Sequence, residues 1–281
     1  MGVEPSAELR VAEPDEVYPS AYRVTELATQ AVGRATGAVA AFDRVRTGRE
    51  QVASVDRLHA AIAFRSERLL RIDGAPPPSP WGPIAGTYAT ADGGWVQIHA
   101  NFDHHEARAL EVLGVAGPDR DAVAAAVAAR KAQELEDAMA AAGAVASRQR
   151  TTEEWLAHPH GRALGPLSLL DLDALGVADR EVPEPADDRP LSGVKVLDLT
   201  RVIAGPLAGR FLTAYGAEVL KVDGAHLPQV DLLVVDTGPG KRSCFLYLRD
   251  DDDRDRFLAL VDDADVVVDG YRPGALGALG L

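Results

Sequence analysis

The 281-residue sequence has little of several residue types, and each shortage excludes a class of protein. A single cysteine, Cys244, excludes an internal disulfide framework. Acidic residues outnumber basic ones by 43 to 29, and the formal net charge of −14 argues against a nucleic-acid partner. No apolar run approaches the roughly 20 residues that span a membrane, and the N-terminus lacks the apolar region of a signal peptide. We therefore expect a soluble, cytoplasmic protein without a membrane partner.

The histidines and acidic runs give no metal-binding pattern. His104 and His105 are adjacent, so on a helix they point in different directions, and no third ligand is spaced nearby. The run Asp250–Asp253 lacks the ligand ladder of a calcium loop and is typical of a turn followed by an acidic helix start. We expect no metal site. Cys244 lies in an apolar stretch, which favours a buried strand residue over a nucleophile.

Changes in composition divide the chain into segments. The stretch 74–83 is rich in proline, and 177–190 is acidic and contains prolines, so both are typical of linkers. We expect a loose lead-in at 1–20, helices at 21–73 that pack on a large domain, a small α+β domain at 84–176, a linker at 177–190 and an α/β block at 191–281.

Hydrophobic periodicity predicts the elements of the N-terminal two thirds. Small apolar residues at three- and four-residue spacing predict a helix over 21–43, and Gly48 marks the break that follows it. Alternating residues around Asp92-Gly93 predict a β-hairpin over 87–100. Further helices are expected at 57–70, 104–113, 119–142 and 152–158. The Ala-rich stretch 119–142 is charged on one face, which favours a solvated surface helix.

The C-terminal block has the pattern of a parallel α/β sheet. Three short apolar runs, Val194–Leu199, Glu218–Val222 and Val266–Val268, alternate with helix-like stretches. A further strand is expected at Cys244–Leu248. The sheet looks incomplete, because the sequence stops soon after Val268.

Several residues of this block are candidates for binding an anionic ligand, which an acidic protein can hold only in a local basic or amide-rich patch. The turn Ala204-Gly205-Pro206 leaves backbone groups exposed at a helix N-terminus. Lys221 and Asp223 end a strand, where ligands of α/β proteins gather. The run GPGKRS (238–243) lacks the spacing of a P-loop and indicates a turn, with Lys241 or Arg242 available to phosphates. Alternatively, 204–206 and 272–274 are only tight turns.

The motifs of the block resemble those of the family III CoA-transferases. The resemblance rests on L-x-G-V-x-V-L-D-L-T (191–200), A-G-P (204–206), G-A-E-V-L-K-V-D (216–223), G-K-R-S (240–243) and D-V-V-V-D-G-Y-R-P-G (265–274). The N-terminal part is similar to what normally follows that block: R-x-x-T-G-R-x-Q (44–51), the hairpin and E-W-L-A-H-P (154–159). The segments thus stand in displaced order, and T-G-R-E-Q replaces the usual T-G-R-G-Q.

The resemblance implies an α/β fold with a Rossmann-like parallel sheet plus a small α+β domain. It also implies acyl-CoA and a carboxylic acid as substrates, no permanently bound cofactor, and an interlocked homodimer or an intramolecular tandem partner. Gly270-Tyr271 stands where the family usually has Asn-Phe, and Ile203 replaces a polar residue of some relatives. The implied CoA contacts are Ile203, Ala204, Gly205, Pro206, Lys221, Asp223, Lys241, Arg242, Gly270, Tyr271 and Arg272.

The nucleophile implied by the resemblance is an aspartate that forms acyl-enzyme intermediates. Counting back from Thr47-Gly48 leads to Glu26 instead. Glu26 is either a nucleophile one methylene too long or an exposed residue of the first helical turn near the positive end of the dipole. The sequence therefore leaves open a CoA-transferase and a noncatalytic, CoA-binding or structural half of a tandem protein. An acyl-CoA racemase is disfavoured, since no histidine precedes Glu26 to pair with a carboxylate.

Overall fold

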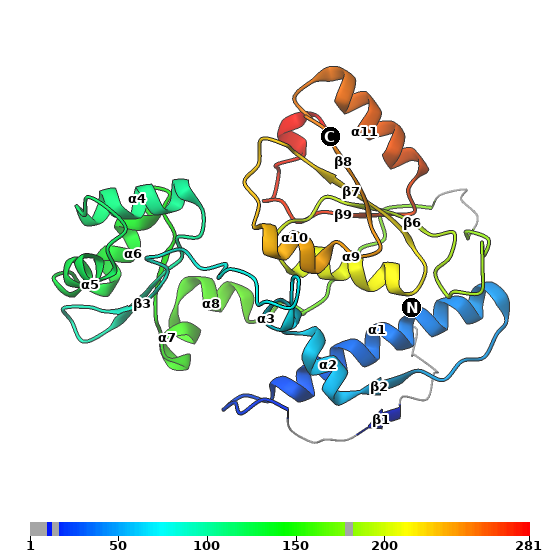
Figure 1. Ribbon diagram of the computed structural model, residues 1–281, viewed down its shortest axis with the longest axis horizontal. Helices are drawn as coiled ribbons and strands as arrows, with labels where there is room; N and C mark the ends of the chain where they lie inside the picture. The colour runs from blue at the N-terminus through cyan, green and yellow to red at the C-terminus, as the bar shows by residue number, and fades with distance from the viewer. Residues whose placement is uncertain (1–9, 13–16, 178–181) are drawn as a thin grey trace. The chain divides into compact units, whose positions relative to one another are not determined.

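A computed structural model describes residues 10–12, 17–177 and 182–281 (Figure 1). The chain divides into two compact units: unit 1 comprises Met1–Pro78 with Arg180–Leu281, and unit 2 comprises Ser79–Asp179. The expected lead-in at 1–20 and linker at 177–190 lie partly outside the described residues.

Unit 1 contains the predicted parallel sheet. Within residues 182–281, its strands are β6 (Lys195–Asp198), β7 (Glu218–Asp223), β8 (Arg242–Phe245) and β9 (Val266–Val268), and all pairs are parallel. Their order is β8-β7-β6-β9, so the chain first moves outward from β6 and then returns to its other side. This is the order of the first four strands of a doubly wound sheet, whose ligands bind where the direction reverses. That point lies between β6 and β9.

Three helices connect these strands and cover the two faces of the sheet: α9 (Ala204–Ala214), α10 (Asp231–Thr237) and α11 (Asp251–Asp263). Val196 and Val219 face α9, whereas Leu197 and Val222 pack with Phe257 of α11. Alternating residues of each strand thus fill two cores. A one-turn 3₁₀ helix, η1 (Gly277–Leu279), follows β9.

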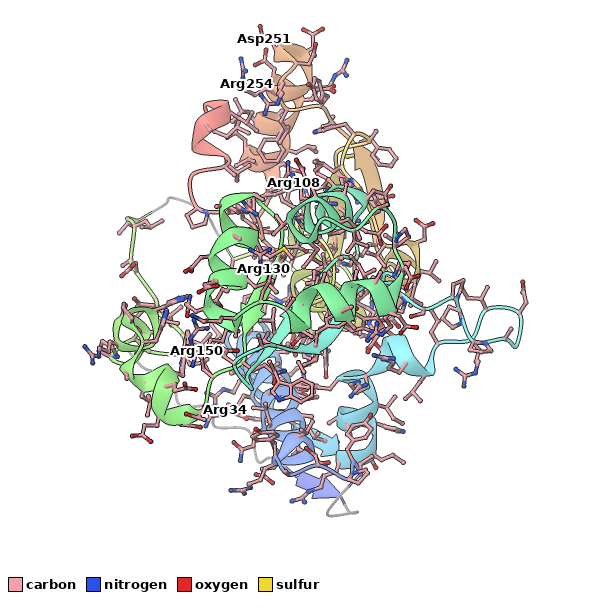
Figure 2. The ribbon with its side chains drawn as sticks, turned by 90° about the vertical axis from the view of Figure 1, so that its left-hand side faces the viewer. Arg34, Arg108, Arg130, Arg150, Asp251 and Arg254 are labelled. Atoms are coloured by element: carbon pink, nitrogen blue, oxygen red, sulfur yellow. The ribbon has the colours of Figure 1, made fainter. Side chains whose placement is uncertain are left out.

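The aspartates at the start of α11 stabilise the helix terminus, as predicted from the sequence. The Asp250 carboxylate accepts a hydrogen bond from the backbone N–H of Asp253, which caps the helix. Asp251 forms an ion pair with Arg254 at 2.6 Å, one turn further along (Figure 2). The aspartates of this run are therefore helix-terminal residues.

The long helix α1 (Val24–Thr47) packs on the same side of the sheet as α9. It extends four residues beyond the predicted 21–43 and ends at Gly48, whose φ of 73° is the left-handed cap that glycine adopts readily. The Thr36 hydroxyl lies 3.0 Å from the Tyr215 hydroxyl at the end of α9. Val39 and Phe42 join the core on that face of the sheet.

The prediction of one continuous helix over 57–70 is wrong. The structure has α2 (Arg57–Ala63) and α3 (Ser66–Leu69), separated at Phe64. The Ser66 hydroxyl donates to the Asp236 carboxylate at 2.7 Å and accepts from Arg210 at 3.1 Å, contacts that hold α3 against α9 and α10. Two short strands, β1 (Arg10–Ala12) and β2 (Ser54–Asp56), pair in parallel.

Unit 2 contains an antiparallel sheet. The predicted hairpin is confirmed as β3 (Gly86–Ala89) and β4 (Trp95–Ile98), with Tyr88 opposite Val96. A third strand, β5 (Ala146–Arg148), pairs with β4. The helices of the unit are α4 (Asp103–Leu113), α5 (Arg120–Ala128), α6 (Ala132–Ala141), α7 (Thr152–Ala157) and α8 (Pro159–Leu164).

The single solvated helix predicted over 119–142 is wrong. The chain breaks between α5 and α6, because the Asp92 carboxylate in the hairpin turn accepts from the backbone N–H of Ala132 at 3.3 Å. The Arg130 carbonyl accepts from the Ala91 N–H in the same turn. One face of each helix is also fully buried, through Val123, Val127, Leu135 and Met139.

Candidate active site at the carboxyl edge of the parallel sheet

The carboxyl ends of the parallel strands surround a cavity of about 380 Å³. This edge is where doubly wound sheets bind their ligands, as the sequence predicted for Asp223. Leu199 after β6 and Val222 in β7 contribute apolar lining. The polar and aromatic lining comes from Asp223, His226, Tyr247, Arg249 and Tyr271. Of the predicted contacts, Asp223 and Tyr271 thus reach one cavity.

Asp223 is held in place by its neighbours. Its carboxylate accepts from Gln229 Nε2 at 2.7 Å and from the Gly224 N–H at 3.0 Å, and it pairs with Lys221 Nζ at 2.7 Å. Only 5% of the Asp223 side chain is exposed, against 14% for Lys221. Lys221 therefore neutralises Asp223, and its ammonium is already engaged by a carboxylate.

Tyr271 follows β9 and forms part of the cavity wall. Burial raises the pKa of its phenol, and the Asp223 carboxylate adds to that shift. Its backbone N–H donates to the Asp269 carboxylate at 2.8 Å, which fixes the turn after the strand. The raised pKa keeps the phenol of Tyr271 protonated at neutral pH. Arg272 is exposed, and its carbonyl accepts from the Ala275 N–H, as in a turn.

Sequence reasoning missed His226, Tyr247 and Arg249. The rings of His226 and Tyr247 meet edge to face, with centroids 4.9 Å apart. The signal that could have found them is their position just after β7 and β8, at the same edge as Asp223. Cys244 packs half-buried in β8 as predicted, and burial raises the pKa of its thiol, which disfavours a nucleophile.

The turn Ala204-Gly205-Pro206 forms the first turn of α9, beside the end of β9. A Cβ on Gly205 would lie 2.3 Å from Cβ of Thr200, so only glycine permits this approach. Gly270 lies against the same threonine, where a Cβ would be 3.4 Å from Thr200 Cβ. Thr200 therefore brings the ends of β6 and β9 together, at the point where the strand order reverses. Ile203, 40% exposed, precedes the helix.

A residue with a strained backbone conformation, Val202, lies just before the 204–206 turn. Val202 has a φ of 70°, a left-handed conformation that β-branched residues rarely adopt. Such conformations persist only where the surroundings hold them, and they gather at functional sites. Two residues before Val202, the buried Thr200 is held in place, because its N–H and its hydroxyl both donate to the Asp198 carboxylate.

The structure corrects the prediction that Lys241 is available to phosphates. Its side chain is 3% exposed, and Nζ donates to Asp198 Oδ2 and to the Pro206 carbonyl, both at 2.7 Å. Burial lowers the pKa of Lys241, and the Asp198 carboxylate acts in the opposite direction. The amine lies beneath the first turn of α9, so it supports that turn from inside.

Arg242 lies at the opposite end of the strands. It is the first residue of β8, and its guanidinium pairs with Glu218, the first residue of β7, at 3.1 Å. Lys195 and Asp263 lie near the same end and line a separate hollow with Arg242. The prediction that groups Arg242 with the other ligand contacts is therefore not supported by its position.

Glu26 lies in the first turn of α1, with 31% of its side chain exposed. Its Oε1 accepts a hydrogen bond from Gln30 Nε2, and Oε2 is 3.9 Å from the Arg57 guanidinium. Ala31, Val32 and Ala35 of α1 line a groove together with residues 207–214 of α9, and the Thr36 hydroxyl contacts the Tyr215 hydroxyl just after α9. The two helices thus run in the same direction, so the first turn of α1, which contains Glu26, and the first turn of α9 lie at the same end of the pair (Figure 1).

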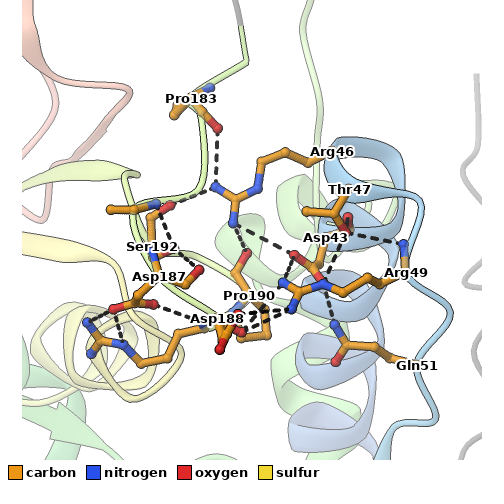
Figure 3. A network of polar contacts seen from close by, with 12 residues as sticks. Asp43, Arg46, Thr47, Arg49, Gln51, Pro183, Asp187, Asp188, Pro190 and Ser192 are labelled. Carbon is orange, nitrogen blue, oxygen red and sulfur yellow. Dashed lines mark hydrogen bonds and ion pairs between the residues drawn. The ribbon is translucent and has the colours of Figure 1, made fainter.

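The R-x-x-T-G-R-x-Q motif forms a buried polar network that sequence reasoning did not predict (Figure 3). Its centre is Asp43, which is completely buried. Arg49 donates to the Asp43 carboxylate at 3.1 Å, and Gln51 Nε2 donates to its other oxygen. Arg46 lies 3.7 Å from the same carboxylate. The motif thus surrounds one charged carboxylate with cations and donors.

Arg46 ties this network to the segment that precedes β6. Its guanidinium donates to the carbonyls of Pro183, Pro190 and Ser192 at 3.2, 2.9 and 2.7 Å (Figure 3). The side chain is 2% exposed. A planar guanidinium suits such divergent acceptors better than an ammonium. The end of α1 is thereby fixed to the entry of the parallel sheet.

The histidines and carboxylates of the described residues do not gather into a metal centre. Over 10–12, 17–177 and 182–281, His, Cys, Asp and Glu side chains form no group of three that could hold a metal ion. The same residues include no helix long and apolar enough to cross a membrane. His158 stacks on Trp155 with ring centroids 5.7 Å apart and caps α8.

Comparison with known proteins gives matches along most of the chain. The model of CoA-transferase family III matches residues 21–177 and 191–281. An acyl-CoA transferase of Gibberella moniliformis is 33% identical over 214 residues, which are 69% of this chain and 36% of the relative. A succinyl-CoA:mesaconate CoA-transferase of Haloarcula marismortui is 39% identical over 101 residues, 31% of this chain and 26% of the relative.

A solved structure of a hypothetical protein from Mycobacterium tuberculosis is 38% identical, with a TM-score of 0.31, over 35% of this chain and 29% of that one. The matched parts span about a third or less of the length of these relatives.

Proposed function

The chain belongs to CoA-transferase family III, and we propose that it takes part in moving CoA from an acyl-CoA to a carboxylic acid. The names of its relatives, an acyl-CoA transferase and a succinyl-CoA:mesaconate CoA-transferase, support this reaction class. In this reaction the CoA thioester is a substrate, so the proposal requires no permanently bound cofactor.

The observation that carries the proposal is the shared end of α1 and α9. Glu26 stands in the first turn of α1, and Ala204–Pro206 is the first turn of α9. Exposed N–H groups at the start of α9 favour negative charge, which develops on the oxygen of an attacked thioester. A carboxylate and an anion-binding turn at one end of a helix pair suit acyl transfer.

In the proposed reaction, the Glu26 carboxylate attacks the thioester carbonyl, and the C–S bond breaks. The products are a mixed anhydride and CoA thiolate. The thiolate then attacks the glutamyl carbonyl, which releases the donor acid and leaves a glutamyl-CoA thioester. The acceptor carboxylate attacks that thioester, and the returning thiolate attacks the acceptor carbonyl of the second anhydride. Acceptor-CoA leaves, and the Glu26 carboxylate is restored.

We assign the nucleotide end of CoA to the cavity beside Asp223. Its aromatic lining, His226, Tyr247 and Tyr271, suits a purine, and Arg249 offers a cation to phosphate. Pantetheine would then run past Gly270 toward the 204–206 turn. This assignment keeps seven of the eleven predicted contacts: 203–206, Asp223, Gly270 and Tyr271. It omits the buried Lys241, the exposed Arg242, and Lys221 and Arg272, which do not line the cavity.

A second candidate function is a noncatalytic, CoA-binding half of a longer protein. The surroundings of Glu26 favour it, because Gln30 and Arg57 already engage both carboxylate oxygens. Glutamate is also one methylene longer than the aspartate implied by the resemblance, and a misplacement of about 1 Å can cost about 100-fold in rate.

The test combines binding with isotope exchange. Exchange of labelled acetate into acetyl-CoA reports the complete cycle, and hydroxylamine converts a glutamyl thioester into a hydroxamate that mass spectrometry locates. We expect exchange and a hydroxamate on Glu26, both lost in Glu26→Gln and retained in the exposed control Glu50→Gln. Exchange that survives in Glu26→Gln excludes this nucleophile. CoA binding without any exchange supports the noncatalytic half, and absence of CoA binding removes both functions.

A further inference from the structure

Arg201, in the segment between β6 and α9, is a half-buried arginine without a partner. Within residues 10–12, 17–177 and 182–281 its guanidinium makes no hydrogen bond or ion pair. A half-buried cation has lost part of its hydration, and proteins normally compensate it with an anion or an acceptor. The other half-buried arginines among the described side chains each contact a carboxylate or a carbonyl oxygen: Arg44, Arg46, Arg57, Arg130, Arg148, Arg150, Arg210 and Arg254.

The backbone on both sides of Arg201 has a defined conformation. Thr200 before it donates its N–H to the Asp198 carboxylate at 2.9 Å, and Val202 after it has the strained φ of 70°. A strained residue persists only where its surroundings hold it. Arg201 therefore stands on a preorganised backbone, which is what a residue that recognises a ligand requires.

Arg201 lies where the strand order reverses, at the edge of the cavity that Tyr271 lines. A Cβ on Gly270 would be 3.5 Å from Thr200 Cα, so the segments that follow β6 and β9 touch at this point. Burial raises the pKa of the Tyr271 phenol, the Asp223 carboxylate raises it further, and the Arg201 guanidinium acts in the opposite direction. Since a charge shifts a pKa appreciably only at short range, the guanidinium lies near the phenol.

The proposed course of CoA leaves Arg201 to the acyl group. The nucleotide is assigned to the cavity beside Asp223 and Arg249, and pantetheine to the path past Gly270 toward the 204–206 turn. Pantetheine carries no charge, and in the thioester the reacting carboxyl group has become a neutral carbonyl. The anion that remains at this end of an acyl-CoA is a second carboxylate of the acyl group. A guanidinium matches a carboxylate with two parallel hydrogen bonds.

We propose that Arg201 binds the distal carboxylate of a dicarboxylic acyl group, which makes dicarboxylic acids and their CoA thioesters the preferred substrate class. The assignment rests on the proposed function, because the course of CoA places the thioester beside the 204–206 turn, three positions after Arg201. An acyl group that ends in a methyl leaves the guanidinium unpaired. Leaving a half-buried polar group of the site without its partner is what makes such a site reject the wrong substrate.

The experiment uses the 281-residue chain and thioether analogues of acyl-CoA that cannot be turned over. S-(2-carboxyethyl)-CoA and S-(4-carboxybutyl)-CoA end in a carboxylate, and S-propyl-CoA and S-pentyl-CoA are their uncharged counterparts of equal carbon number. Calorimetric titration gives the four dissociation constants. We expect at least one carboxylated analogue to bind about tenfold or more tightly than its counterpart, as a charge-assisted pair provides. Without a local cation the net charge of −14 would favour the uncharged analogues.

Variants of Arg201 separate the carboxylate contact from the rest of the CoA site. Arg201→Gln is expected to abolish the advantage of the carboxylated analogue, while the two uncharged analogues bind within about twofold of the parent. Arg201→Lys keeps the charge but not the planar fork, so it should retain part of the advantage. The control Arg34→Gln removes an exposed arginine of α1 and changes the net charge equally, so it should retain all of it. Circular dichroism on each variant verifies that it is folded.

The outcomes distinguish this assignment from the proposed function. If the parent binds no carboxylated analogue more tightly than its counterpart, the dicarboxylic substrate class is wrong while CoA binding stands. If Arg201→Gln weakens all four analogues equally, Arg201 contacts the common CoA part, and the assignment is overturned. It is overturned as well if folded Arg201→Gln keeps the advantage, or if Arg34→Gln loses it. If none of the four analogues binds, the proposed CoA site falls, and the role of Arg201 falls with it.

Discussion

Lys241 and Asp198 form an ion pair in which both side chains are almost completely buried. Nζ lies 2.7 Å from Asp198 Oδ2, with 3% and 0% of the side chains exposed. The same ammonium donates to the Pro206 carbonyl, and the other Asp198 oxygen accepts from Thr200. One amine thereby connects the end of β6, the entry to β8 and the first turn of α9. The first turn of α9 therefore lies over a buried cation.

Replacing Lys241 with Met is expected to destabilise unit 1 by about 3–5 kcal/mol. The change leaves the Asp198 carboxylate buried without its cation, which is the costly way to break such a pair. Urea unfolding followed by far-ultraviolet circular dichroism gives the free energy of unfolding. The control is Lys195→Met, which breaks an exposed pair with Asp263 at 2.7 Å and should change stability by no more than about 1 kcal/mol. Equal effects of the two substitutions would show that the buried pair has no special role.

Replacing Arg46 with Lys is expected to cost about 1–3 kcal/mol although the charge is kept. A lysine cannot reach the carbonyls of Pro183, Pro190 and Ser192 together, so buried acceptors lose their donors. Chemical unfolding measures the loss. Arg44→Lys is a matched control two positions earlier in the chain, because the 3.7 Å contact of Arg44 with Glu50 is exposed to solvent. A loss no larger than that of Arg44→Lys would contradict the network described for the motif.

We expect Glu136 to stabilise unit 2 at neutral pH and to lose this effect in acid. Hydrogen bonds from Arg150 are the main reason that the pKa of Glu136 lies below its ordinary value of 4.5. A carboxyl with a lowered folded-state pKa stabilises the protein above its unfolded-state pKa. That stabilisation is lost as the pH falls from about 4.5 through the folded-state pKa. We expect Glu136→Gln to be less stable at pH 7 and to depend less on pH below 4.5.

Tryptophan fluorescence can follow this effect in the full chain. The three tryptophans, Trp81, Trp95 and Trp155, all belong to unit 2. Urea midpoints at pH 3.5, 4.5 and 7 would be compared for the parent and the variant. Glu134→Gln serves as control, since Glu134 makes an exposed contact with Lys131 at 3.3 Å. Parallel pH profiles of the parent and Glu136→Gln would exclude the assigned role.

The sequence was a good guide where local pattern determines structure. Apolar runs predicted β6, β7 and β9, and Asp92-Gly93 predicted the hairpin, because strand burial and turn chemistry are local properties. The break between α5 and α6 was not predictable in that way. Its cause is the Asp92 carboxylate, 40 positions earlier in the chain, which accepts from the Ala132 N–H. Helical periodicity alone does not contain that contact.

In the candidate site, too, some residues could be placed from the sequence alone and others could not. The position of Asp223 at the sheet edge followed from its place at the end of a strand, whereas Tyr271 was implied by the family resemblance. Lys241 and Arg242 are neighbours in the sequence, and both looked available to phosphate. Only the packing of α9 over the sheet shows that one lies beneath the helix and the other at the opposite end of the strands. Composition cannot distinguish an internal lysine from an external one.

The strand β9 makes the isolated chain prone to self-association. Among the described residues, β9 pairs with β6 alone, so it forms one border of the parallel sheet. It consists of three valines, two of which, Val266 and Val267, are 40% and 42% exposed. A sheet border rich in β-branched apolar residues readily recruits strands of other molecules. Concentrated preparations are therefore expected to self-associate through Val266–Val268, and a lysine at Val267 is the first substitution to try for solubility.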